Sequence, residues 1–463
     1  MNYDFDPFDK PFDSITAEDL AILKTVAEGW YVEYKREVPN ASSISKSVTA
    51  FSNTYGGWLF YGIDELSKEN AVAGSFPGVP LDEADAFLQR IRQSVAANAQ
   101  PTPFFRVRAI TGPAPLIDLE DGRCIIIAQI PWGPEAPYIH KSGVIFRRVG
   151  DSSEPRPEND RYMLDQLWKR SEKITERYEN WIDEELEISE AERNLPFLQI
   201  FVIRDFWRDH PPIKPLSLKK VREILADKGP YTLPFDKVYE TRREYVCRQT
   251  TVDDPERMSL TWKLSRGLNS ELIIPLPNYN VRGVGEALRH FDGYSHIERF
   301  LKICGDQNYK DPKIIDVNMI LLLLLGFCRT LVSLSDEIGW EGDFHAKLKF
   351  RGLWRTISFF DMKEFLDDFE AYGLPLMLRD EVVVSAGKDF QSYIHLRRPD
   401  VDAPIIMRGT QIATDLWFNI ALALGAPMLD DATEGKADSF LDMGQRAIDV
   451  QKKRLERSIN ALG

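Results

Sequence analysis

A short apolar segment, WLFYGI (58–63), is the feature that most restricts how this chain can fold. Bulky side chains occupy both parities of the segment. Because side chains alternate across a strand, both of its faces must be covered. The segment follows a glycine pair, Gly56-Gly57, and leads into two acids, Asp64 and Glu65. It therefore predicts a central strand of a layered sheet, with acidic side chains at its C-terminal end.

The segment 31–35, YVEYK, predicts a second strand. Alternation places Glu33 and Lys35 on one face of this strand and its apolar residues on the other. The acids that follow the central strand obey the same rule, so only one of Asp64 and Glu65 faces the side on which Glu33 lies. Strand parity alone leaves open which of the two it is.

Helices are predicted before and after the strand 31–35. Thr16 and Asp19 form a capping-box-like start for a helix that runs to residue 27 and places Glu28 at its end. Asn40 caps the next helix, and the turn at Gly56 ends it. The apolar face of that helix consists of Ile44, Val48 and Phe51.

Acidic side chains on the ends of different elements, with a lysine among them, suggest a divalent-metal site that acts on phosphate. Glu28, Glu33 and an acid at 64–65 would supply the oxygen ligands, and Lys35 lies among them. Mg²⁺ and Mn²⁺ take such ligands while keeping several waters. The alternative is a group of surface acids around a structural ion pair of Lys35.

The glycine pair 56–57 has two interpretations. It could let a phosphate approach backbone amides, or it could end a helix before a buried strand, which is the favoured interpretation. The chain contains no G-x-x-x-x-G-K-[ST] motif, which excludes a nucleotide-hydrolysing P-loop.

Two sequence motifs resemble the AlbA-like domain of the Schlafen family. VEYK (32–35) followed by SVTAFSNTYGGWLFYGIDE (47–65) is similar to its pattern E-S-x-x-V-E-F-K, then S-A-F-A-N-T-x-G-G-x-L-L-I-G-V-D-D. PYIHKSGVIFRRVGDSSEPRP (137–157) resembles the later hairpin and helix entry of that domain. The resemblance covers about residues 15 to 175.

The resemblance implies an RNase site of two glutamates and an aspartate that binds Mn²⁺ or Mg²⁺. The glutamates fall on Glu28 and Glu33, and the aspartate falls on Glu65, with Asp64 as a substitute. Lys35 would contact the scissile phosphate or steady the acids. The chain departs from the pattern with Glu65 for Asp, Gly29 for Ser, Tyr34 for Phe and Ser52 for Ala.

On this basis, the expected function is a metal-dependent endoribonuclease that cleaves tRNA-like structured RNA in stress or defence. Schlafen proteins use two lobes to hold base-paired RNA, so a chain with one lobe is expected to form a homodimer. A non-catalytic, nucleic-acid-binding transcriptional regulator that binds DNA or RNA is the alternative from a different class. A nucleotide-sensing module is the third hypothesis.

A set of basic residues is expected to position a nucleic-acid backbone. Its members are Lys46, Arg147, Arg148, Arg156 and Arg161, and ordinary surface charge is the alternative interpretation. The set is small enough to suit a structured RNA held at a few phosphates by its shape.

Composition limits the remaining choices. A net charge of −14 and a pI of about 5.1 argue against indiscriminate binding along nucleic acid. Four scattered cysteines and an acidic N-terminus without a signal peptide predict a cytoplasmic protein with no zinc site. The apolar run 319–328 is too short to span a bilayer and predicts a buried helix, so no membrane association is expected.

The whole chain is predicted as a mixed α/β or α+β protein. An extended acidic arm (1–14) precedes the Schlafen-like domain (15–175), whose last helix leads into an acidic helical linker (176–194). A subdomain of longer, mostly antiparallel strands (195–280) is followed by a mainly helical C-terminal domain (281–463). In the strand 344–351, His345, Lys347, Lys349 and Arg351 share one face. That face is expected to be solvated, and a stacking and phosphate surface is the less favoured interpretation.

Overall fold

The structure is a computed structural model of the chain, and it divides into two compact units. The first contains Met1–Trp181 with two short later segments, and the second contains Ile182–Asp205, Pro215–Ile338 and Gly342–Gly463. The structure describes all residues except 1–4, 9, 11, 68, 150–151, 206–213, 228–231, 251–255, 281–289, 386, 388–391, 399, 401, 427–442, 444, 448 and 451–463. The sequence predicts a turn at the proline-bearing segment 211–215 and helices over 284–304 and 436–461. Part of the turn, the start of the first helix and most of the second lie outside the described residues.

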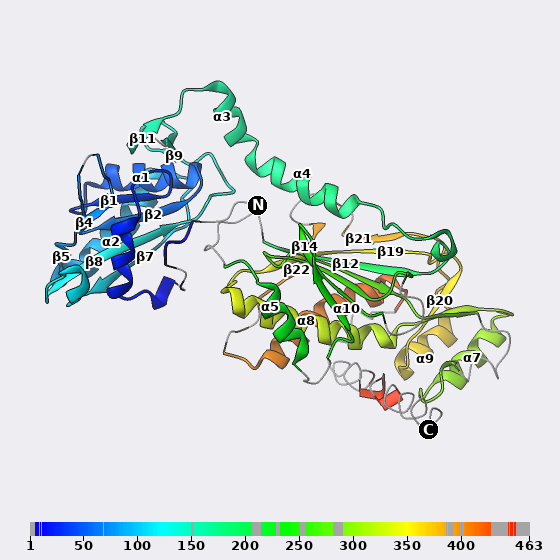
Figure 1. Ribbon diagram of the computed structural model, residues 1–463. Coiled ribbons are helices and arrows are strands. Elements are labelled where there is room, and N and C mark those ends of the chain that lie inside the picture. The colour runs from blue at the N-terminus through cyan, green and yellow to red at the C-terminus, as the bar shows by residue number, and fades with distance from the viewer. Residues whose placement is uncertain are drawn as a thin grey trace. The chain divides into compact units, whose positions relative to one another are not determined.

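The first unit is built on a five-stranded mixed sheet (Figure 1). Its order is β1-β2-β8-β5, and β7 also pairs with β8. β1 and β2 are parallel, whereas β8 runs antiparallel to β2, β5 and β7. The strands are β1 (Val32–Lys35), β2 (Gly57–Tyr61), β5 (Val79–Pro80), β7 (Arg106–Thr111) and β8 (Arg123–Ile130).

Both faces of this sheet are covered, as the apolar segment 58–63 predicts. All five residues of β2 are buried. On one face, α1 (Ala41–Asn53) and α2 (Ala84–Asn98) pack against alternate residues of β2 and β8. On the other face lie the 3₁₀ helices η1 (Phe12–Ser14), η2 (Glu18–Thr25) and η4 (Pro115–Ile117). The central strand is therefore buried by apolar layers on both sides.

The described residues of the N-terminal arm pack against the sheet of the first unit. Phe8 and Phe12 are buried beside Trp58, and the Trp58 indole Nε1 donates a 2.9 Å hydrogen bond to the carbonyl of Phe5. The predicted helix 16–27 is a 3₁₀ helix that ends at Thr25. It begins at Glu18 without a side-chain cap, so the capping-box-like start is only half formed: the carboxylate of Asp19 accepts hydrogen bonds from the amide and hydroxyl of Thr16.

Short strands and two helices complete the first unit. β3 (Asp64–Glu65) pairs with β4 (Ala73–Ser75), and β6 (Ala99–Gln100) pairs with β9 (Ile139–His140). β10 (Phe146–Val149) pairs with β11 (Ser152–Pro157), and α3 (Arg161–Trp168) and α4 (Arg170–Asp183) follow. The sequence predicts a hairpin turn at Lys141-Ser142-Gly143, and this turn is present, because the amide of His140 donates to the carbonyl of Val144.

The second unit contains an eight-stranded antiparallel sheet with the order β13-β14-β15-β16-β12-β19-β21, and β22 also pairs with β19. The strands are β12 (Phe197–Arg204), β13 (Lys237–Glu240), β14 (Glu244–Arg248), β15 (Thr261–Ser265), β16 (Ser270–Pro275), β19 (Phe344–Arg351), β21 (Val382–Val384) and β22 (Ile394–Leu396). The sequence predicts a single strand over 238–250 and another over 260–275, but each range is a hairpin, because Thr241 and Leu268 lie in tight turns.

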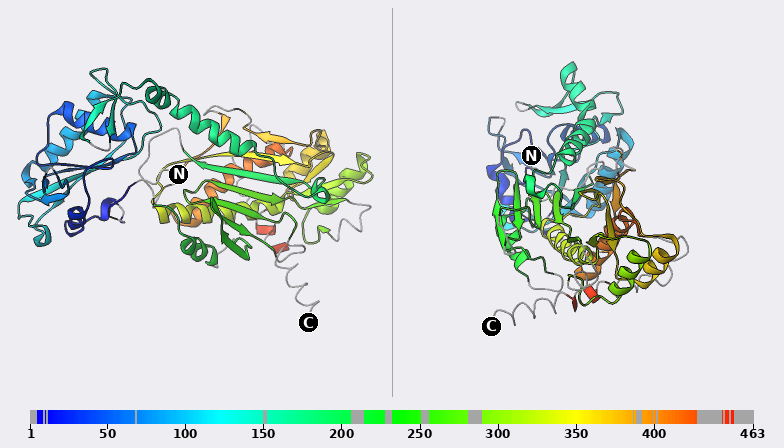
Figure 2. Two further views of the ribbon diagram at one scale, coloured as in Figure 1. Left: turned by 45° about the horizontal axis from the view of Figure 1, so that its top comes forward. Right: turned by 90° about the vertical axis from the view of Figure 1, so that its right-hand side faces the viewer.

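Helices cover this sheet and a smaller one beside it (Figure 2). α8 (Asn318–Ile338) packs Phe327 against Trp262 of β15, and α10 (Ile405–Ala423) packs along α8. Further helices of this unit are α5 (Leu218–Ala226), α7 (Ile297–Asp306) and α9 (Lys363–Tyr372). β17 (Asn278–Asn280), β18 (Lys313–Asp316) and β20 (Thr356–Phe359) form the smaller sheet.

α8 is long and apolar enough to cross a membrane by length and composition. Of its most apolar window, 61% is buried inside the fold, which is the behaviour of a core helix. This placement agrees with the buried helix predicted for the run 319–328.

Two predictions for the second unit are wrong. The acidic run after residue 183 is not a helix, except for a single 3₁₀ turn, η5 (Glu190–Glu192). The polar face of β19 is not solvated, because the carbonyls of Gly387 and Ile182 accept hydrogen bonds from Lys347 and Lys349. Lys347 is 2% exposed and also lies 4.2 Å from the ring centre of Tyr393.

Candidate functional site

Glu33 lies inside the first unit, on the face of β1 that α1 covers. Its Oε2 lies 2.8 Å from Nη1 of Arg148 in β10, and neither side chain is exposed. Its Oε1 accepts a 3.1 Å hydrogen bond from the hydroxyl of Ser47 in α1 and lies 3.1 Å from Nζ of Lys35. Both oxygens of Glu33 are therefore already engaged by donors from three different elements.

Lys35 shares this face of β1, as the alternation of the segment predicts. Burial lowers the pKa of its ammonium group, but the charges of Glu33 and Glu28 outweigh burial, so the pKa is raised above its usual value. The ammonium group of Lys35 therefore stays protonated beside the two glutamates. Its side chain is about one-third exposed, so the charge faces solvent in part.

Glu28 lies in the loop before β1 and is half-buried. Its Oε1 accepts a short hydrogen bond from the backbone amide of Tyr34. Its Oε2 is buried and has no hydrogen-bond donor among the described residues. Burial, with a smaller contribution from Glu65, raises the pKa of Glu28 to about 8, against the lowering effects of the Tyr34 amide and Lys35.

Glu65 is exposed. It lies beside Glu28 because both residues pair with the segment 71–73, which leads into β4. The amide of Glu28 donates to the carbonyl of Ala71, and Glu65 pairs with Ala73. A carboxylate is only an acceptor, so a hydrogen bond between Glu28 and Glu65 forms only when one of the two is protonated. This is the physical reason that Glu65 favours the protonated form of Glu28.

Asp64 faces a different group of residues. Its Oδ2 lies 2.8 Å from Nη1 of Arg36 and within 3.4 Å of the hydroxyl of Ser75. Of the two neighbouring acids, Glu65 is therefore the one that acts on Glu28.

The three glutamates do not form one three-ligand set. Across the part of the chain that the structure describes, no group of three or more His, Cys, Asp or Glu residues is arranged to hold a metal ion. Glu33 forms ion pairs with Arg148 and Lys35. In the carboxyl pair Glu28–Glu65, by contrast, Oε2 of Glu28 is buried and has no donor among the described residues. Carboxylate oxygens are the ligand type that a divalent cation with several waters takes, and such a cation would replace the proton that the pair otherwise retains.

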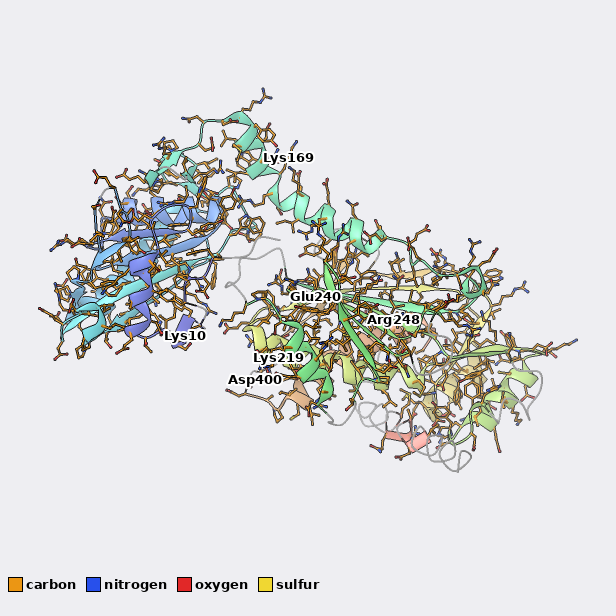
Figure 3. All side chains as sticks on the ribbon, in the orientation of Figure 1. Lys10, Lys169, Lys219, Glu240, Arg248 and Asp400 are labelled. Atoms are coloured by element: carbon orange, nitrogen blue, oxygen red, sulfur yellow. The ribbon has the colours of Figure 1, made fainter. Side chains whose placement is uncertain are left out.

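The predicted basic residues are not one surface. Arg148 is buried, and Arg147 forms a 2.7 Å ion pair with Glu158. Lys46 lies half-buried, 5.2 Å from the ring centre of Phe146. Arg156 and Arg161 are exposed, as is Lys169 between α3 and α4 (Figure 3).

Two groups of residues were missed by sequence reasoning. Arg148 was assigned to the surface although it is the buried counterion of Glu33. Its position next to Arg147 in a strand was a signal, because only one of two neighbours can point inward. The second group is aromatic: Trp30 and Tyr55 expose large rings next to Glu28 and next to the glycine pair. The signal in the sequence was the position of these aromatic residues, two residues after Glu28 and directly before Gly56-Gly57.

Three comparisons with known proteins gave one match that bears on the sequence resemblance. A solved structure of the DIP2311 protein from Corynebacterium diphtheriae is similar at 17% identity, over 34% of this chain and 31% of that chain. Its TM-score of 0.21 is too low to support any argument. No curated protein matches the chain. Residues 28–157, from Glu28 through β11, match the family model described as Schlafen, AlbA_2, so the predicted Schlafen-type domain is confirmed for this part of the first unit.

Proposed function

We propose that the first unit binds structured, tRNA-like RNA and hydrolyses its phosphodiester bonds with Mn²⁺ or Mg²⁺, in stress response or defence. The Schlafen, AlbA_2 match suggests a nucleic-acid-related function. The metal-dependent hydrolysis is our proposal, and it rests on the carboxyl pair of Glu28 and Glu65.

The observation that supports hydrolysis most directly is the buried Glu28 Oε2, which has no donor among the described residues and lies near a second carboxyl. Two acids held together in this way hold a proton at neutral pH unless a cation replaces it. Such an arrangement costs stability, and costly ionisable pairs are concentrated at functional sites. Glu28 and Glu65 are therefore the residues that would hold the metal.

The surrounding residues have separate tasks in this proposal. A bound Mn²⁺ or Mg²⁺ would supply an activated water and neutralise charge on the phosphate. Lys35 would face a non-bridging phosphate oxygen with its ammonium group. Arg148 and Ser47 would hold Glu33, and Glu33 would in turn orient Lys35.

The decisive experiment incubates total RNA with the full chain, with and without Mn²⁺, and maps the cleavage ends at nucleotide resolution. Wild type is expected to cleave tRNA only with metal, and Glu28→Gln is expected to abolish cleavage. Asp64→Asn is the matched control, because Asp64 is a neighbouring acid that pairs with Arg36 and is expected to be dispensable. Cleavage that persists in Glu28→Gln, or no cleavage by wild type, would contradict the proposal.

One observation favours the alternative, a nucleic-acid-binding regulator without catalysis. Glu33 falls on a catalytic glutamate by resemblance, yet both of its oxygens are engaged by Arg148, Lys35 and Ser47. If the chain binds a specific DNA or RNA sequence in EDTA and leaves it intact when Mn²⁺ is added, the regulator is the correct function.

Homodimer formation also remains part of the proposal. A second copy would supply the second lobe that a base-paired RNA needs. Sedimentation of the full chain with and without tRNA measures the oligomeric state directly, and a monomer in both conditions would remove this part of the proposal.

A further inference from the structure

Four aromatic rings form a continuous run beside Glu28. Phe5 stacks on Tyr31 with ring centres 5.2 Å apart and planes 22° apart. Tyr31 lies 6.0 Å from Tyr55, and Tyr55 lies 5.5 Å from Trp30. The four residues are called the aromatic run below.

Two rings of the run are exposed. Trp30 is 38% exposed and Tyr55 is 43% exposed, whereas Trp58 and Phe60 of the neighbouring strand are buried. Exposed large aromatic rings lose the stabilisation that burial would give them. They are the groups on which nucleic-acid bases stack, because every base presents a π-face.

A pocket adjoins the run. It has a volume of about 400 Å³ and is lined by Phe5 and residues 25–32, which include Glu28. This volume falls within the ~300–1,000 Å³ typical of small-ligand sites. Ligand pockets combine apolar walls with a few polar groups, and Glu28 provides such a group to walls of aromatic and aliphatic side chains.

The loop that contains Trp30 is fixed by hydrogen bonds from Arg148 and within its own backbone. The guanidinium of Arg148 donates two hydrogen bonds to the carbonyl of Gly29, at 3.1 and 2.6 Å. The amide of Gly29 donates to the carbonyl of Val32. A surface fixed in this way binds a flat ligand without first losing the conformational freedom of a loop.

We propose that the aromatic run and its pocket bind an unpaired nucleobase of an RNA strand, next to the carboxyl pair. The inference rests on the proposed function for the presence of RNA, and adds that the site accepts an unstacked, single-stranded nucleotide. A base on Trp30 and Tyr55 would place its own backbone close to Glu28, Glu65 and Lys35. The site would then select loops or ends of a structured RNA over its paired stems.

The test measures binding in EDTA, so that neither metal nor cleavage enters the result. The probes are a fluorescent single-stranded ribo-oligonucleotide and the same oligonucleotide with abasic residues at its central positions. Wild type is expected to bind the base-bearing probe more tightly. Trp30→Ala and Tyr55→Ala are each expected to weaken binding of that probe about 5- to 150-fold, the range for loss of one base–aromatic stack. Binding of the abasic probe is expected to stay unchanged.

Three controls separate stacking from other effects. Trp30→Phe keeps an aromatic face and is expected to retain most of the affinity. Tyr372→Ala removes an 86%-exposed ring from the second unit and is expected to have no effect. Thermal unfolding of each variant shows whether the fold is intact.

The proposal and the proposed function fail in different ways. Equal affinity of wild type for both probes, or equal losses on both probes in Trp30→Ala, would overturn the nucleobase site and leave RNA binding standing. Base-dependent binding that is lost in Trp30→Ala, in a protein that never cleaves RNA, would support the nucleobase site and remove only the hydrolase.

Discussion

Arg148 places its Nη1 atom 2.8 Å from Oε2 of Glu33, and the two side chains are 0% and 1% exposed. Residues 115 positions apart are thereby joined in the interior of the first unit. The same carboxylate also contacts Lys35 and Ser47, so a single acid ties β1 to α1 and β10. This geometry makes Glu33 an anchor of the fold as well as a candidate site residue.

Arg148→Ala is expected to destabilise the first unit by about 3–5 kcal/mol, because it leaves the carboxylate of Glu33 buried without its main counterion. Urea unfolding followed by the fluorescence of the full chain measures the loss. Arg147→Ala is the matched control: Arg147 pairs with Glu158, and both side chains are partly exposed, so its loss is expected to be smaller. Equal losses in the two variants would show that burial of the Glu33 pair has no special weight. For the same reason, Glu33→Ala is a poor test of catalysis.

The stability of the protein is expected to fall as pH rises from about 4.5 to 8, through the ionisation of Glu28. The folded state holds the proton of Glu28 up to a pKa of about 8, whereas the unfolded chain releases it near the ordinary value of 4.5. The native state therefore binds more protons in that window, and stability declines with pH there. Glu28→Gln is expected to reduce this decline, as measured by thermal unfolding across the window. An unchanged pH profile in Glu28→Gln would contradict the raised pKa.

Mn²⁺ is expected to raise the thermal unfolding midpoint of wild type and to have no effect on Glu28→Gln. A ligand that binds only the folded state stabilises it by about 2.7 kcal/mol at one hundred times its Kd. The effect is expected to grow as pH approaches 8, because the metal must displace the proton of Glu28. Glu65→Gln should weaken the effect, and Asp64→Asn should leave it intact. A midpoint shift of the same size in Glu28→Gln would place the cation elsewhere.

Gly56→Ala is expected to destabilise the first unit more than Gly143→Ala does. Both glycines have a positive φ, +72° and +78°, and an alanine in that region costs about 1–2 kcal/mol. At Gly56, a Cβ would also lie 2.7 Å from the carbonyl oxygen of Ile130 and the amide of Trp132, whereas nothing lies within 4 Å at Gly143. The difference in unfolding midpoint isolates the packing cost, and equal midpoints would contradict it.

The Gly56 environment also decides between the two interpretations of the glycine pair. The amide of Gly56 donates to the carbonyl of Phe51 at the end of α1, and β8 approaches too closely for a side chain. The pair therefore ends a helix and admits a neighbouring strand, which is the interpretation that the sequence favours.

The sequence by itself determined the local elements of the first unit. Bulky residues on both parities of 58–63 required a strand buried on both faces, and alternation placed Glu33 and Lys35 together on β1. The cap of α1 at Asn40 was also predictable, because Asn is a favoured N-cap residue. In the structure, the Asn40 side chain accepts a hydrogen bond from the amide of Ser43. These features depend on periodicity and capping, which are encoded within a few neighbouring residues.

Only the tertiary structure decided which acids stay available. Arg148 neutralises Glu33 from a strand more than one hundred residues away, and β4 brings Glu65 to Glu28. In the second unit, carbonyls of Ile182 and Gly387 accept the lysines of β19 that its alternating pattern had assigned to solvent. Alternation specifies that a strand has two faces, but what covers each face depends on contacts between distant segments, and these determine burial, charge pairing and pKa.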